Sequence, residues 1–267
     1  MSDRWIGFDM DECVGSVMPI YAFLHSIPVD VVVSHLLPAL IRSEALNNTW
    51  IIRKAFVHSL PTIWSAYRSG NIAGCFIFSN NGSELLVRFI CVFINTVIQT
   101  QFGLTSMPAL FKMGVWSGAP WRPSGHAKNL VGVQNSLAAH GLPILSNIDG
   151  LLFFDDMDHE LSNEIYHYVK VPPYFYHTPI EKVITALCCI EHAVGSDAWN
   201  KICKQAVSME KSDFVDRGNM YRSEQQMLGE IRKETKLFQK ALNAFLDEPI
   251  MTEITYKIKK KKTKTRL

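Results

Sequence analysis

The chain has 267 residues, of which 48% are hydrophobic and 19% charged, and its formal net charge is +2. This balance is typical of a globular protein with one large core, or one core and a small accessory unit, and it excludes a disordered chain. The positive excess belongs to the last eleven residues, Lys257 to Leu267, which hold seven Lys or Arg and no acid, so the remaining body is mildly acidic.

The cysteines and the long apolar stretches indicate where the protein works. The six cysteines lack the spacing of a disulfide framework, and no secretory leader is evident before Trp5. We therefore expect free thiols and an intracellular protein, cytoplasmic or nuclear. The apolar stretches at 29–41 and 84–98 are too short or too interrupted to cross a bilayer, so we expect buried helices there and no membrane partner.

The first predicted strand is the apolar run at 5–8, which ends at Asp9 and is followed by Asp11. Short apolar runs between polar residues favour strands buried on both faces, and residues two apart in an extended chain point to the same side. Two carboxylates held together repel each other unless a cation balances them, and Mg²⁺ suits such a position. The alternative is a strand-end turn in which the carboxylates accept hydrogen bonds from backbone amides.

The segment at 14–70 is too long for a simple crossover helix and has helical character at 31–44 and 50–67, so we interpret it as a helical insertion beside the site. A second apolar run at 75–78 then ends at Ser79 and Asn80. A hydroxyl and backbone amides at the start of a helix form a cradle for phosphate. The other interpretation is a plain cap for a helix at 84–99, a role for which Ser83 is well placed.

Lys128 begins a predicted helix over 127–140, 27 residues before Asp155. A lysine in a crevice neutralises both a phosphate and a pair of aspartates, although most lysines are solvated surface residues. Lys112 competes for the same role, but it lies inside a possible strand at 111–116. Only its order in the chain favours Lys128.

A third apolar run at 151–154 ends at Asp155 and Asp156. A carboxylate at this point completes an octahedral Mg²⁺ site that keeps several waters, and another acidic turn is the alternative. Strands that alternate with helices predict an α/β fold with a parallel sheet, to which 166–171 adds a further strand. Because ligands bind beyond the carboxyl ends of such strands, we expect the three polar strand ends to face one crevice.

Taken in order, these pieces resemble the haloacid dehalogenase superfamily, whose pattern is an Asp-x-Asp strand, a strand ending in Ser or Thr, a helix-borne Lys and an acidic pair. The corresponding residues here are Asp9, Asp11, Ser79, Lys128, Asp155 and Asp156. The resemblance covers roughly residues 4–192. It implies a Rossmann-like sheet with the first strand central, and a Mg²⁺-dependent phosphomonoester hydrolase that works through an aspartyl-phosphate.

The resemblance also implies the catalytic roles. Asp9 is the expected nucleophile and a Mg²⁺ ligand, and Asp11 is the expected general acid and base, which also binds Mg²⁺ through its backbone carbonyl. Within the superfamily, residues 9–14 are similar to the Asp-Leu-Asp-Glu-Thr-Leu signature of phosphatases that act on the RNA polymerase C-terminal domain. Cys13 and Ser79 stand where that branch has Thr, and the insertion looks helical where that branch carries a sheet-like one.

The binding roles follow in the same way. Ser79, with Asn80 beside it, and Lys128 are expected to hold the phosphoryl group. Asp155 is expected to complete the metal site, and Asp156 assists directly or through water. The predicted organisation is a catalytic core over residues 1–192, a helical extension over 193–250, and a basic tail over 251–267 that is predicted to be disordered.

The expected substrate is a phosphoprotein or a small phosphorylated metabolite. The tail from Lys257 to Arg266 is typical of a nuclear-import signal or a nucleic-acid contact, and equally of a solvated terminus. One alternative function is therefore a nucleic-acid end phosphatase that uses this tail. Another is a binding protein that keeps the fold without activity. Transfer of the phosphoryl group to an acceptor other than water is also open.

Overall fold

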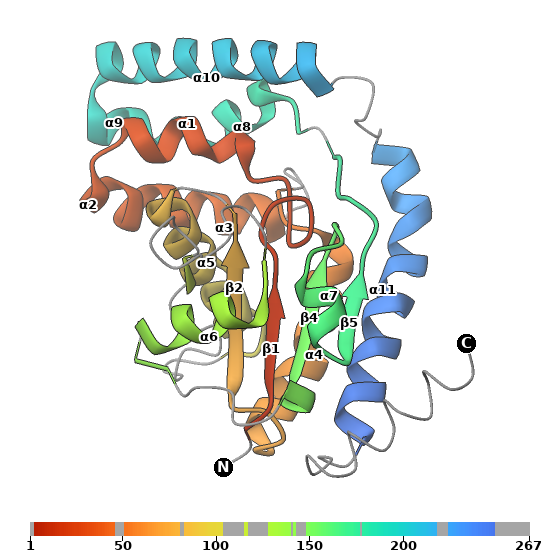
Figure 1. Ribbon diagram of the computed structural model, residues 1–267. Coiled ribbons are helices and arrows are strands. Elements are labelled where there is room, and N and C mark those ends of the chain that lie inside the picture. The colour runs from red at the N-terminus through yellow and green to blue at the C-terminus, as the bar shows by residue number, and fades with distance from the viewer. Residues whose placement is uncertain are drawn as a thin grey trace.

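The computed structural model of this chain describes residues 3–45, 51–80, 83–103, 115–116, 128–139, 141–142, 148–176, 178–217 and 224–248. Over these residues the protein has an α/β, Rossmann-like fold, in which a parallel sheet carries helices on both faces (Figure 1). The fold class predicted from the alternation of apolar runs and helical segments is confirmed at this level.

Among the described residues, the sheet has five strands. They are β1 (Trp5–Phe8), β2 (Gly74–Ser79), β3 (Val115–Trp116), β4 (Leu151–Asp155) and β5 (His167–Lys170). Their order is β3-β2-β1-β4-β5, and every pairing is parallel. The chain leaves the central β1 toward β2 on one side and later crosses to β4 on the other. In open sheets of this kind the ligand crevice lies where the order reverses, here beyond the carboxyl ends of β1 and β4.

The strands are buried because their residues alternate between two apolar layers. Phe8 and Phe154 belong to the larger layer, whereas Trp5 and Phe153 belong to the smaller one on the opposite face. The alternation leaves no room for a side chain at Gly7, where a Cβ atom would lie 2.4 Å from a ring carbon of Phe153. Glycine is therefore required in the centre of the sheet by its aromatic neighbours.

The helices fall into three groups along the chain. Those between β1 and β2 are α1 (Met18–Ser26), α2 (Val29–Val31), a π-helical segment (Val32–Leu36), α3 (Leu37–Ala45) and α4 (Lys54–Arg68). Those between β2 and β5 are α5 (Glu84–Gln101), α6 (Leu130–Ala139), a 3₁₀ segment (Ile148–Gly150) and α7 (Leu161–Glu164). Those after β5 are α8 (Ile180–Leu187), a 3₁₀ segment (Cys188–Ile190), α9 (Glu191–Val194), α10 (Ser196–Arg217) and α11 (Glu224–Asp247).

Helices from the insertion and from the C-terminal region lie together beyond the carboxyl ends of the strands. Figure 1 shows α1, α2 and α3 at the top of the view with α8, α9 and α10. α1 packs against α10, where the rings of Phe23 and Trp199 have centroids 5.9 Å apart, and α3 packs against α8. Two segments far apart in the sequence therefore build one helical layer next to the predicted crevice.

The long helix α11 runs beside β5 and packs along α4 (Figure 1). Its Phe238 ring stacks on Phe154 of β4, with centroids 4.8 Å apart. At the C-terminal end of the helix, where backbone carbonyls have no partner within a helix, Arg4 donates hydrogen bonds to the carbonyl oxygens of Leu246 and Glu248. The helix therefore contacts the sheet at both ends of β1, through Phe154 beside Phe8 and through Arg4.

Three further sequence expectations concern chemistry rather than topology. All six cysteines are free thiols. In the part of the chain that the structure describes, no helix is both long and apolar enough to cross a membrane. The basic tail and Lys112 lie outside the described residues.

Candidate active site

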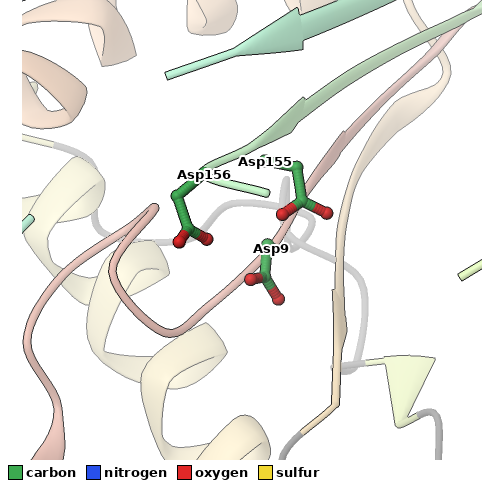
Figure 2. A group of neighbouring side chains, drawn as sticks. All are labelled: Asp9, Asp155 and Asp156. Atoms are coloured by element: carbon green, nitrogen blue, oxygen red, sulfur yellow. The ribbon is translucent and has the colours of Figure 1, made fainter. Parts of the chain in front are cut away.

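Three carboxylates meet where the strand order reverses. Asp9 directly follows β1, and its backbone amide donates to the carbonyl oxygen of Phe154 at 2.9 Å, which continues the β1–β4 ladder past the strand end. Asp155 ends β4, and Asp156 follows it. One carboxylate oxygen from each of the three lies within 4.8 Å of those of the other two, and all three side chains are buried. Figure 2 shows the carboxylates turned toward a common space.

Lys128 supplies the positive charge of this cluster. Its Nζ lies 2.7 Å from Oδ1 of Asp9 and 2.8 Å from Oδ2 of Asp155, and only 1% of its side chain is exposed. The side chain of Asn129 caps α6 by accepting a hydrogen bond from the amide of Gly132 at 2.8 Å. The helix therefore begins at Leu130, two residues after Lys128. The prediction that the helix begins at Lys128 is therefore wrong by two residues, and a solvated surface position for this lysine is excluded.

One ammonium does not balance three buried carboxylates. Burial raises the pKa of Asp9 to about 7, with Lys128 opposing the rise and Asp155 adding to it. Burial and the neighbouring Asp155 also raise the pKa of Asp156. Burial lowers the pKa of Lys128, but the two aspartates outweigh it and the net shift is upward, so the lysine stays charged. The metal-free cluster consequently keeps excess negative charge or takes up a proton.

The carboxylates of Asp9, Asp155 and Asp156 fit a hard divalent cation such as Mg²⁺. Magnesium prefers carboxylate oxygens, and oxygens bound to one ion lie up to about 4.2 Å apart, at twice the usual bond length. The oxygens of the cluster lie within 4.8 Å of one another, so small side-chain rotations would bring them to this spacing. A cation would also offset the two effects that raise the pKa of Asp9, which are burial and, after it, the repulsion from Asp155.

Adding Mg²⁺ to the metal-free protein is expected to raise its Tm by about 5–10 °C at a hundredfold excess over Kd. The gain in Tm should be larger near pH 8 than near pH 5.5, because Mg²⁺ binds the deprotonated carboxylate and the pKa of Asp9 is about 7. The folded protein keeps a proton on Asp9 up to about pH 7, whereas the unfolded chain loses that proton near pH 3.8. The ionisation of Asp9 therefore lowers the stability of the metal-free fold as the pH rises from about 4 to 7.

Thermal unfolding with and without Mg²⁺ at the two pH values measures this effect. Asp155→Asn removes a cation ligand and should abolish the shift. The exposed Asp30 of α2 provides the control, because Asp30→Asn should leave the shift unchanged. A shift of equal size at both pH values would contradict the assignment of the ion to the buried carboxylates.

Asp11 and Ser79 form a second pair beside the carboxylate cluster. The hydroxyl of Ser79, at the end of β2, donates to Oδ2 of Asp11 at 3.4 Å, which is a long hydrogen bond. The Asp11 side chain is partly exposed and lies outside the group of three aspartates. Asn80 follows Ser79 with an exposed side chain. Ser83 caps α5 by accepting a hydrogen bond from the amide of Leu86 at 3.2 Å, as predicted. The cap of the helix is therefore Ser83, and the Ser79 hydroxyl lies beside Asp11 instead.

The backbone between Asp11 and Gly15 is a tight turn. Glu12 has φ of 60°, a left-handed value that no other non-glycine residue in the described part of the chain adopts. Such a conformation costs about 1–3 kcal/mol and persists only where the surroundings enforce it. The Glu12 carbonyl accepts from the amide of Tyr174 at 2.7 Å and from Arg53 Nη2 at 3.1 Å. At Gly15 a Cβ atom would lie 2.1 Å from the carbonyl oxygen of Ile51, so the turn also requires glycine.

Sequence reasoning missed several residues around the cluster. His159 Nε2 lies 3.8 Å from Oδ2 of Asp155. Tyr168 of β5 donates to the carbonyl oxygen of Met157, and burial, with Asp155 as the next cause, raises the pKa of its hydroxyl. Neither residue belongs to a motif. The only sequence signal for them is their position just after, or next to, the end of β4.

The structure thus brings Asp9, Lys128, Asp155 and Asp156 into direct contact range and places Asp11 and Ser79 next to each other. No family model, no curated protein and no solved structure matches this chain. The function must therefore be inferred from the chemistry of the site.

Proposed function

We propose that the protein is a Mg²⁺-dependent phosphomonoester hydrolase of the haloacid dehalogenase type, in which Asp9 is the nucleophile. The observation that carries the proposal is the buried cluster of Asp9, Asp155 and Asp156 around Lys128, at the carboxyl ends of adjacent central strands. The central position of β1 also agrees with what the sequence resemblance implies.

In the first half-reaction, a carboxylate oxygen of Asp9 attacks phosphorus while the bond from phosphorus to the leaving oxygen breaks. Asp11 gives its proton to that oxygen, which departs as an alcohol. In the second half-reaction, Asp11 takes a proton from water as the water oxygen attacks phosphorus. The bond from phosphorus to Asp9 then breaks, which releases phosphate and restores both carboxyl groups to their starting states.

The remaining polar residues hold the reacting group. Lys128 neutralises charge on the phosphoryl oxygens while it keeps Asp9 oriented through their ion pair of 2.7 Å. Ser79 offers a hydroxyl donor from the end of β2. Asp9, Asp155 and Asp156 would hold Mg²⁺, with the Asp11 carbonyl as a further ligand implied by the resemblance. The ion, when bound, stabilises the negative charge that builds up on phosphoryl oxygens.

The proposed substrate is a phosphoprotein or a small phosphorylated metabolite. The helical layer of α1–α3 and α8–α10 lies beyond the carboxyl ends of the strands, and in such folds the elements around the site select the substrate. The nucleic-acid end phosphatase is a separate prediction that rests on the basic tail alone. Hydrolysis of a phosphopeptide, a sugar phosphate and a 3′-phosphorylated oligonucleotide would rank these three classes.

The proposal is tested by hydrolysis of 4-nitrophenyl phosphate in the presence of Mg²⁺ and after its removal by EDTA. Turnover should require the ion, and it should return when Mg²⁺ is added back. Beryllium trifluoride, which imitates a phosphoryl group on a carboxylate, should raise Tm only together with Mg²⁺. Absence of turnover on every phosphomonoester tried, with Mg²⁺ bound, would leave the fold as that of a binding protein and defeat the proposal.

A further inference from the structure

A buried arginine links the turn at Glu12 to distant parts of the chain. Arg53, which immediately precedes α4, has a fully buried side chain. Its Nη2 donates to the carbonyl oxygen of Glu12 at 3.1 Å and to the carbonyl oxygen of Pro172 just after β5. Its own amide donates to the carbonyl oxygen of Val14 at 2.9 Å. Arg53 therefore contacts the turn after β1 from both its side chain and its backbone.

The positive charge of Arg53 is balanced from the C-terminal helix. Oε2 of Glu234 in α11 lies 3.7 Å from Arg53 Nε, and 6% of the glutamate side chain is exposed. The guanidinium also lies over the rings of Tyr174 and Phe238, at 5.2 and 5.9 Å from their centroids. A planar guanidinium has a rigid fork of donors and flat faces that can lie on aromatic rings, whereas a lysine ammonium has neither.

The contact bears directly on Asp11, which is bonded to Glu12. Glu12 has a left-handed backbone in the turn to which Asp11 belongs, and Arg53 and Tyr174 both donate to the Glu12 carbonyl. Loss of one of the two donors would let the turn relax toward an ordinary backbone conformation. The Asp11 carboxyl would then lose its fixed direction, although no atom of Arg53 touches it in the described contacts.

We propose that Arg53 is a positioning residue for the Asp11 general acid, and that Glu234 holds Arg53 in place, so that the C-terminal helix α11 is a working part of the active site. The proposal rests on the phosphatase function proposed above and adds to it the residues that hold the Asp11 general acid in position. A proton from Asp11 matters most when the leaving oxygen is a poor leaving group, such as an alkoxide, and least for 4-nitrophenolate.

The test compares kcat/KM for 4-nitrophenyl phosphate with kcat/KM for phosphoserine in the same enzyme sample. The ratio of the two is independent of the fraction of enzyme that is folded. Arg53→Lys should lower the phosphoserine value about tenfold more than the 4-nitrophenyl phosphate value. Glu234→Gln should shift the ratio in the same direction and serves as a milder variant if Arg53→Lys does not fold.

Arg4→Lys is the matched control. Arg4 also donates to backbone carbonyl oxygens and also lies over an aromatic ring, that of Phe245, but its contacts are at the far end of α11. Arg4→Lys should lower Tm without changing the ratio of the two kcat/KM values. In an Asp11→Asn background, Arg53→Lys should no longer change the ratio, because both substitutions act through the same proton transfer. An unchanged ratio in both Arg53→Lys and Glu234→Gln would overturn the inference.

Hydrogen exchange separates this inference from the proposed function. The amide of Tyr174, which donates to Glu12, should exchange faster in Arg53→Lys than in the wild type or in Arg4→Lys. If the wild type hydrolyses no phosphomonoester, the proposed function fails, and faster exchange would still show that Arg53 holds the turn. Unchanged exchange would overturn that part of the inference whether or not the protein is a phosphatase.

Discussion

Asp9→Asn is expected to lower the turnover of a phosphomonoester by on the order of 10⁴-fold or more, because it removes the proposed nucleophile. An amide oxygen does not form an acyl phosphate, and the remaining donors cannot replace it. The fold should survive, because Asn keeps the shape of the side chain and the backbone hydrogen bond from Asp9 to Phe154 is unchanged. Loss of a buried charge, together with relief of the repulsion from Asp155, should even raise the Tm of the metal-free protein.

Steady-state kinetics and thermal unfolding of the same sample separate loss of chemistry from loss of fold. Asp30→Asn makes the same chemical change at an exposed position in α2 and should leave turnover within about twofold of the wild type. Turnover of Asp9→Asn within about tenfold of the wild-type value would remove Asp9 from the reaction.

Lys128→Met is expected to destabilise the fold by about 3–5 kcal/mol near neutral pH, because breaking a buried ion pair leaves its partner charge uncompensated. Lys128 is the group that holds down the pKa of Asp9, so its loss should raise that pKa further. The folded variant would then bind protons that the unfolded chain has released. Its stability should therefore fall as the pH rises from about 4 through 7 and beyond. Turnover should fall as well, since the charge on the phosphoryl oxygens loses a partner.

Denaturant unfolding near pH 5.5 and near pH 8 measures this dependence, with and without Mg²⁺. The loss should be smaller at the lower pH, and Mg²⁺ should recover part of it by supplying positive charge to the same carboxylates. Lys170→Met is the control, because Lys170 pairs with Asp158 at an exposed position near the site. It should change stability by less than about 1 kcal/mol. An equally mild effect of Lys128→Met would contradict the buried cluster.

The strands and their acidic ends were predictable because their signals are local. Each of β1, β2 and β4 is a short apolar run that ends in a polar residue, and a general rule about parallel sheets brings such ends to one edge. Burial of Lys128 was not predictable from its surroundings in the chain. It depends on Asp9 and Asp155, which only the sheet brings beside it.

The support around the site was beyond sequence reasoning for the same reason. Arg53 contacts Glu12, Pro172 and Glu234, which lie 41, 119 and 181 residues away along the chain. Nothing local distinguishes Arg53 from a surface arginine at the start of a helix. The C-terminal helix is expected as part of the helical extension, but its ion pair with Arg53 and the stacking of Phe238 on Phe154 depend on residues far away in the chain.

Trapping of the covalent intermediate tests the central claim most directly. The Asp11→Asn variant lacks the base for the second half-reaction, so it should accumulate phosphoenzyme from an aryl phosphate with a radiolabelled phosphoryl group. After an acid quench, the label should be sensitive to hydroxylamine, as an acyl phosphate is, and peptide mapping should place it on Asp9. Turnover that continues without such a label, or a label found on Ser79 or any other residue, would contradict Asp9 as the nucleophile.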